Sequence, residues 1–220
     1  MFILFGEKIH SESCTVGLLP CGVCGQERPF DKIVETSYFC IFGLRLLPIE
    51  KLANYSQCNH CNNAFDTDAS DAGSFNTKND LPTHIVPLKR ILSYLQVGYG
   101  MQTHRDLAQD ICLKVCSFEY SDDEFSRDVL LASQGKSDIY DYLKIAASRL
   151  NMRGKQEIIE AAFLITHACC EIQYEDRLRI NLMGNALGVS LEFVSSIIDH
   201  VHAQGCYGVR RILPTKTQTS

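Results

Sequence analysis

The chain of 220 residues has an ordinary globular composition, with 45% hydrophobic and 21% charged residues, and it could form one domain or two. Its 21 basic and 26 acidic residues give a net charge of -5, which disfavours general electrostatic binding to nucleic acid or to an anionic membrane. No apolar run reaches the roughly 20 residues that cross a bilayer, and the apolar start, Met1 to Phe5, lacks the basic residues of a signal peptide.

Short strands are predicted in the first fifty residues. Met1 to Phe5 is an apolar run, Ile33 to Phe42 is rich in β-branched and aromatic residues, and residues 44–49 form a second apolar stretch. Residues 26–31 are polar and are predicted to form a turn. A segment with so little apolar surface needs a further source of stability, such as a bound metal ion.

Two Cys-x-x-Cys motifs occupy this region, with Cys24 and Cys58 separated by 33 residues. Two thiolates three positions apart on a tight turn can share one metal ion, and two such turns complete the tetrahedral four-sulfur site that structural zinc prefers. A thioredoxin-like redox pair would need a single motif in a β-α-β context, which the sequence does not show. We therefore predict a structural Zn²⁺ bound by Cys21, Cys24, Cys58 and Cys61.

Several residues around the motifs carry a resemblance to a known family. Phe5-Gly6 lies near the start, and Tyr38 to Phe42 with Leu47-Pro48 form an aromatic, proline-containing insert between the motifs. Together with the cysteines, these residues resemble a family of small bacterial zinc-ribbon domains. The resemblance implies a β zinc-ribbon domain over residues 1–65. Residues 66–83 are predicted to be a flexible linker because they are rich in Asp, Asn, Ser and Thr.

From residue 84 onward the apolar residues recur with the period of an α-helix, and cap residues mark the helix ends. Ser121 and Glu124 have the spacing of a capping box, and Gly188 is placed to end a helix. About seven helices are predicted. Six begin near Pro87, Thr103, Ser121, Ser137, Lys155 and Ser190, and another is marked by Leu178, Leu182 and Ala186. The predicted fold is therefore mainly α, with the small N-terminal β zinc ribbon followed by an all-α bundle over residues 84–213 and a disordered tail at 214–220.

The stretch from Ala168 to Glu175 matches part of a family motif at four positions, namely Ala168, Glu171, Ile172 and Glu175. It resembles the tellurite-resistance TerB-like helical domain, and the resemblance extends loosely over residues 84–210. Cys169 and Cys170 stand where that family has Asp and Gly, so a natural ligand for a hard cation is missing. The resemblance implies a TerB-like bundle and a role in a metal- or membrane-stress response related to tellurite resistance.

Two further constellations in the helical region are open to more than one interpretation. Acidic residues could converge on a second metal site, although helix capping also explains acids in first turns; they are Glu119, Asp122, Asp123, Glu124, Glu171, Glu175 and Asp176. Cys112 and Cys116 lie four apart on one helical face, where Cys169 and Cys170 could approach them. A soft-metal or redox site would use these thiols, but buried core cysteines are the favoured interpretation.

The sequence contains no nucleophile elbow, phosphate loop, dinucleotide fingerprint or HExxH motif. We therefore expect a non-catalytic, zinc-binding protein that interacts with other proteins or acts as an adaptor. With four of eleven cysteines assigned to metal, a reduced, cytoplasmic protein is expected. The alternative is a nucleic-acid-associated zinc-ribbon protein. Residues 1–65 hold five basic and six acidic residues, a balance of -1, so nucleic acid is not the expected partner.

Overall fold

The structure is a computed structural model of the whole chain and describes residues 5–42, 44–66, 81–135 and 138–212. The predicted disordered tail and all but the ends of the predicted linker lie outside the described residues. The chain divides into two compact units, which are described separately. Unit 1 comprises Met1–Thr83 together with Ala147–Gly154, and unit 2 comprises His84–Ala146 and Lys155–Ser220. The short segment Ala147–Gly154 thus groups with the N-terminal residues, although it is distant from them in sequence.

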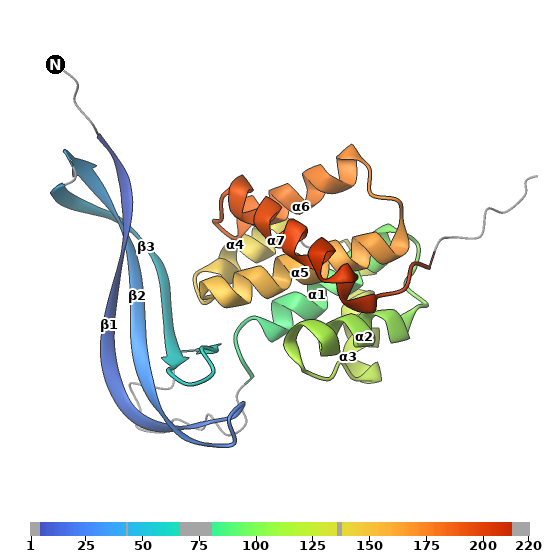
Figure 1. Cartoon of the computed structure of the whole chain (residues 1–220), viewed down its shortest axis with the longest axis horizontal. Coiled ribbons are helices and arrows are strands. Elements are labelled where there is room, and N and C mark those ends of the chain that lie inside the picture. Colours follow the sequence, from blue (N-terminus) through green and yellow to red (C-terminus); the bar gives the residue numbers. More distant parts are fainter. Residues whose placement is uncertain (1–4, 43, 67–80, 136–137, 213–220) are drawn as a thin grey trace, which may run out of the picture. The chain divides into compact units, whose positions relative to one another are not determined.

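Unit 1 contains a four-stranded antiparallel sheet in the order β1-β2-β3-β4 (Figure 1). Its strands are β1 (Phe5–Cys21), β2 (Gln26–Ile41), β3 (Leu44–Cys58) and β4 (Ala64–Phe65). The predicted β region is confirmed, but its first three strands are far longer than expected. The turn predicted at residues 26–31 is wrong, because these residues are the start of β2. Their polar side chains alternate with the fully buried Phe30, which is the pattern of a strand rather than of a turn.

The two faces of the sheet follow from the strand register. Every residue of β2 is paired in order, and the extra residues at the bulges belong to β1 and β3. The even-numbered residues of β2 therefore lie on one face and its odd-numbered residues on the other. Cys21 pairs with Gln26 and Cys58 pairs with Phe30, so both cysteines lie on the even face. We call this face the cysteine face and the other the opposite face. β3 carries three register shifts relative to β2, which bend the strand and increase its twist.

Apolar burial in unit 1 is concentrated at the end of the sheet that carries the cysteines. On the cysteine face, Phe30 and Phe65 pack with their ring centroids 5.6 Å apart, beside Cys21 and Cys58. On the opposite face a second small cluster contains Ala53, Tyr55 and Ala64, with Ile33 packed against it. Neither cluster extends to the far end of the sheet, where β2 turns into β3. The long hairpin is therefore held together mainly by backbone pairing and by the cysteine end.

Within the part of the chain that the structure describes, seven α-helices follow the sheet, as predicted (Figure 1). They are α1 (Ile85–Gly98), α2 (Arg105–Cys116), α3 (Asp122–Ser133), α4 (Ile139–Ala147), α5 (Met152–Cys169), α6 (Tyr174–Ala186) and α7 (Leu191–Ala203), with a short 3-10 turn at η2 (Gly205–Gly208). None of the described helices is long and apolar enough to span a bilayer. The central helix is α5, in which Ile158, Phe163 and Ile165 are completely buried. It is buried on nearly all sides, as is typical of a core helix.

Most of the predicted caps are confirmed. The Ser121 side chain accepts a hydrogen bond from the Glu124 backbone, and the Glu124 side chain accepts one from the Ser121 backbone, which completes the capping box of α3. Gly188, with a φ of +71°, ends α6 in a Schellman motif. The start predicted near Thr103 is one residue early, because His104 is the cap residue of α2. The His104 amide bonds the Met101 carbonyl oxygen at 3.0 Å, and this turn puts His104 at the cap position.

A buried polar network lies in unit 2 around the Tyr120 hydroxyl. This oxygen lies 2.6 Å from the Ser93 hydroxyl and 3.0 Å from an Asp128 carboxylate oxygen. The Lys89 backbone oxygen is a third neighbour at 3.2 Å, and the Lys89 ammonium donates to both carboxylate oxygens of Glu124. The network therefore joins α1 to α3 and to the segment between α2 and α3, with its polar groups satisfied inside the core.

Candidate metal centre

The four predicted ligands lie at the ends of strands. Cys21 is the last residue of β1 and Cys58 the last residue of β3. Cys24 and Cys61 lie in the tight turns that follow, and each turn is closed by a backbone bond to the first cysteine of its motif, from Gly25 to Cys21 and from Asn62 to Cys58, each at 2.9 Å. β1 and β3 flank β2 and both end near its start, with Cys21 paired to Gln26 and Cys58 paired to Phe30, so the two turns lie next to each other.

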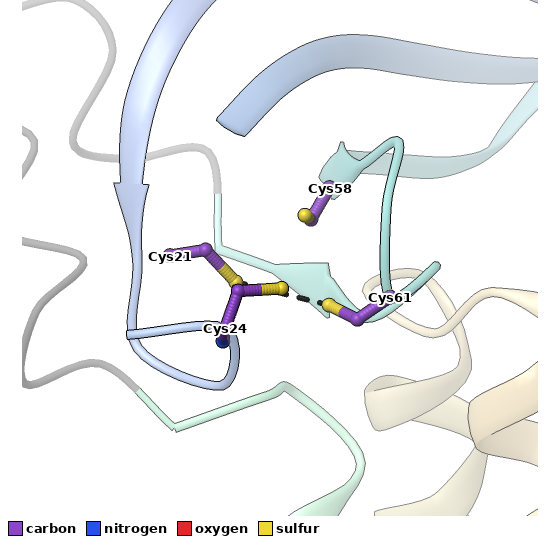
Figure 2. A group of neighbouring side chains, drawn as sticks. All are labelled: Cys21, Cys24, Cys58 and Cys61. Carbon is purple, nitrogen blue, oxygen red and sulfur yellow. Dashed lines mark hydrogen bonds between the residues drawn. The ribbon is translucent and has the colours of Figure 1, made fainter. Parts of the chain in front are cut away.

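All four thiols converge on one point (Figure 2). The ligand atoms of Cys21, Cys24, Cys58 and Cys61 all lie within 4.8 Å of one another, and the Cys21 and Cys61 sulfurs are 3.7 Å apart. A tetrahedral zinc site with Zn–S bonds of about 2.3 Å would place its sulfurs roughly 3.8 Å apart. The group could therefore hold a metal ion after only small side-chain adjustments. Cys21 and Cys58 are buried, whereas Cys24 and Cys61 are partly exposed, so one side of the cluster is reached from solvent.

The environment of the thiols opposes unassisted ionisation of Cys21 and favours that of Cys61. Burial raises the pKa of Cys21 to about 12. Burial also acts to raise the pKa of Cys61, but hydrogen bonds from the backbone and side chain of Asn63 and from the neighbouring thiols of Cys58 and Cys21 together outweigh it, so the pKa is lowered overall. A divalent cation stabilises thiolates strongly, and its binding here would release the protons of the buried thiols. Metal affinity should consequently rise with pH.

The segment Ala147–Gly154 braces the second cysteine turn within unit 1. The Arg153 guanidinium donates to the Cys61 carbonyl oxygen at 2.6 Å, and the Asn151 side-chain amide donates to the Asn62 carbonyl oxygen at 2.7 Å. The Ser148 carbonyl oxygen accepts a bond from the Asn54 amide at 2.9 Å, on the edge of β3 that is not paired with β2. The turn that carries Cys61 is therefore held by residues about ninety positions away in sequence.

Asn151 has a double role that the sequence analysis missed. Its Oδ1 accepts a bond from the Gly154 amide at 2.9 Å and so caps the start of α5, while its Nδ2 holds the Asn62 carbonyl oxygen. Asn is one of the residues preferred at the cap of a helix, so this role could have been read from the sequence. No sequence signal links it to the cysteine turn, because that contact depends on the fold.

The variant Asn151→Asp separates these two roles. Asp retains the oxygen that caps α5 but replaces the donor to Asn62 with a second acceptor. We expect metal release to a chelator to become about 10-fold faster, because partners that orient metal ligands typically alter affinity by 10- to 100-fold. The control is Asn185→Asp, which makes the same change at an exposed position of α6. Equal release rates in the two variants would show that Asn151 does not position the ligands.

The acidic residues do not form a second cluster among the described residues, where the four cysteines are the only group of three or more metal-ligand side chains. Asp122 pairs with Arg105 at 2.7 Å, and Glu124 caps α3 and pairs with Lys89. Asp176 accepts bonds from the Tyr99 hydroxyl at 2.7 Å and from the Gln173 amide at 3.0 Å. These three acids serve helix caps and ion pairs.

Of the helical thiols of interest, Cys112, Cys116 and Cys169 are buried, whereas Cys170 is partly exposed. Cys112 and Cys116 are buried with their sulfurs 3.6 Å apart, and Cys116 donates to the Cys112 carbonyl oxygen at 3.0 Å. Burial raises the pKa of Cys169 to about 12, which keeps this thiol protonated and unreactive. This arrangement agrees with the interpretation of these cysteines as small buried side chains.

Comparisons of the chain with models of protein families, with curated proteins and with solved structures found no match. The structure shows a four-cysteine cluster on a small N-terminal sheet, followed by seven helices, which is compatible with a zinc ribbon joined to a helical domain. The resemblances to the zinc-ribbon and TerB-like families rest on the residues quoted above.

Proposed function

We propose that the four cysteines bind a structural Zn²⁺ and that the chain is a non-catalytic protein that binds other proteins. The observation that supports the metal is the convergence of four sulfurs within 4.8 Å. Tetrahedral four-sulfur sites hold zinc or iron, and paired turns of this spacing are typical of structural zinc. Elemental analysis of protein purified without added metal tests the choice. About one zinc per chain is expected, and one iron per chain would contradict it.

The surface that supports a protein partner is the end of the sheet farthest from the cysteines. On the opposite face there, Leu44 is 70% exposed, Leu47 is 66% exposed and Ile9 is 63% exposed. The register places the exposed carboxylates of Glu7 and Glu50 on the same face. An apolar centre with a charged rim is the composition that protein interfaces favour.

The cellular setting is part of the same proposal. All eleven cysteines are free thiols in the structure, which is consistent with a reducing, cytoplasmic compartment. A role in a metal- or membrane-stress response related to tellurite resistance rests on the TerB-like motif residues alone.

The double variant Leu44→Ser/Leu47→Ser tests the protein-binding surface. We expect it to lose specific partners in affinity purification from the native cell, because it removes the most exposed apolar side chains of this face. Its metal content should be unchanged, since both residues lie far from the cysteine end of the sheet. The control is Leu113→Ser/Leu130→Ser, which changes two exposed leucines of α2 and α3. Recovery of the same partners with both variants would exclude this face as the binding surface.

A further inference from the structure

The sheet separates the charges of unit 1 by sign. Within residues 1–65 the strand register places every lysine and arginine on the cysteine face; these are Lys8, Arg28, Lys32, Arg45 and Lys51. Five of the six acidic residues are on the opposite face; these are Glu7, Glu27, Asp31, Glu35 and Glu50. Only Glu12 shares the cysteine face with the cations. A segment whose charges nearly cancel therefore has one strongly basic face.

Three of the basic residues, Lys8, Arg45 and Lys51, lie around the aromatic side chain of Tyr38. Lys8 is the direct cross-strand neighbour of Tyr38, and the Arg45 guanidinium lies 5.8 Å from the centre of the Tyr38 ring. The His10 ring meets the Tyr38 ring edge-on at 6.2 Å, and Lys51 lies on the same face two pairs further along β3, opposite Thr36. Lys8, Arg45 and Lys51 are exposed, and no described carboxylate lies within ion-pair distance of them. Their charge is available to a ligand.

The shape of the basic surface indicates what kind of anion it suits. The cations follow the strands from the Arg45–Cys40 pair to Arg28, twelve residues along β2, or about 40 Å at 3.3 Å per residue. A linear polyanion with regularly spaced phosphates can contact such a stripe at several points. A bilayer would also need apolar side chains to enter it, and the most exposed leucines of the hairpin end, Leu44 and Leu47, are on the other face.

We propose that the cysteine face binds single-stranded nucleic acid, with Lys8, Arg45 and Lys51 contacting phosphates and the Tyr38 ring stacking on a base. Basic grooves with interspersed aromatic rings bind single strands in this way, because every base presents a flat π-face. A duplex keeps its bases stacked on each other and offers none to Tyr38. This inference is independent of the identity of the metal and of the protein partner. The proposed nucleic-acid site is on the cysteine face, whereas Leu44 and Leu47 are on the opposite face.

The test is fluorescence anisotropy of the full zinc-loaded chain with labelled 20-nucleotide oligo-U and oligo-dT at ~0.15 M salt. We expect micromolar affinity that falls with added salt, with a log–log slope of about -2 for three phosphate contacts. Tyr38→Ala should weaken binding about 10-fold or more, whereas Tyr38→Phe should retain it because the ring remains. Equal loss in both variants would exclude stacking by Tyr38.

A matched pair of charge variants separates the basic face from net charge. Arg45→Glu/Lys51→Glu should abolish binding, while Lys144→Glu/Arg210→Glu makes the same change in net charge at exposed positions of unit 2 and should retain most of it. If the charge reversal in Arg45→Glu/Lys51→Glu alters the metal content or the circular dichroism spectrum, the neutral variant Arg45→Gln/Lys51→Gln replaces it in the test. Three results would overturn the proposal: no binding at ~0.15 M salt, equal affinity for a duplex of the same length, or binding only to phosphatidylglycerol vesicles.

Discussion

The double variant Cys21→Ala/Cys58→Ala is expected to be purified without bound metal and with the sheet of unit 1 unfolded. The two substitutions remove one ligand from each turn, and two thiols do not hold a zinc ion tightly. The buried clusters of unit 1 are small, and Cys21 and Cys58 are themselves half of the buried residues in one of them. Structural zinc contributes apparent binding free energies of about 10 to 16 kcal/mol in small zinc-finger peptides, so little else can replace it.

Metal content by elemental analysis and strand content by circular dichroism measure this result. The control is Cys14→Ala/Cys40→Ala, which removes two thiols of β1 and β2 that lie outside the cluster. It should keep about one metal ion per chain. The helices of unit 2 should remain folded, but the amides of the first turn of α5 should exchange faster, because Asn151 and Arg153 lose the ordered turn that they bond. Equal metal content in the two variants would refute the four-cysteine site.

Replacing Tyr120 by Phe is expected to lower the free energy of unfolding by about 2 kcal/mol, since buried polar groups that lose their partner cost about 1 to 3 kcal/mol. The substitution removes one oxygen atom and leaves the ring packed edge-on against Phe125 at 5.6 Å. The Ser93 hydroxyl and the Asp128 carboxylate remain, both buried, and each loses a neighbour at hydrogen-bond distance. Burial raises the pKa of Tyr120, so the hydroxyl stays a donor throughout the physiological range.

Urea unfolding followed by helical circular dichroism measures this loss. Tyr174→Phe is the matched control, because Tyr174 is 77% exposed at the start of α6 and its removal should change stability by less than about 0.5 kcal/mol. An equally small change for Tyr120→Phe would show that Ser93 and Asp128 find other partners. A shift in the denaturant slope would instead indicate a change in the unfolded ensemble or in cooperativity.

The helical part of the fold was largely readable from the sequence because its signals are local. Ser121 and Glu124 satisfy the first turn of α3 within four residues, and Gly188 ends α6 through bonds to the preceding turn. The same holds for the four cysteines, since each Cys-x-x-Cys turn is defined by neighbouring residues. The lengths of the strands were underestimated. Residues 26–31 carry charged side chains on both faces of the sheet, so the sequence does not show the alternation of a strand, although Phe30 is buried.

Two features, the contact that braces the second cysteine turn and the basic face, were decided only by the tertiary structure, because both depend on pairing between distant residues. The contact of Asn151 with the Asn62 carbonyl oxygen joins residues 89 positions apart, and no local pattern encodes it. The segregation of Lys8, Arg45 and Lys51 from the acidic residues follows from the register of three strands and from the bulges of β3. The sequence by itself predicted the four-cysteine cluster and most of the helix ends, because short-range backbone and side-chain geometry is sufficient for them. The basic face required the register, because a one-residue slip moves a side chain to the other side of a sheet.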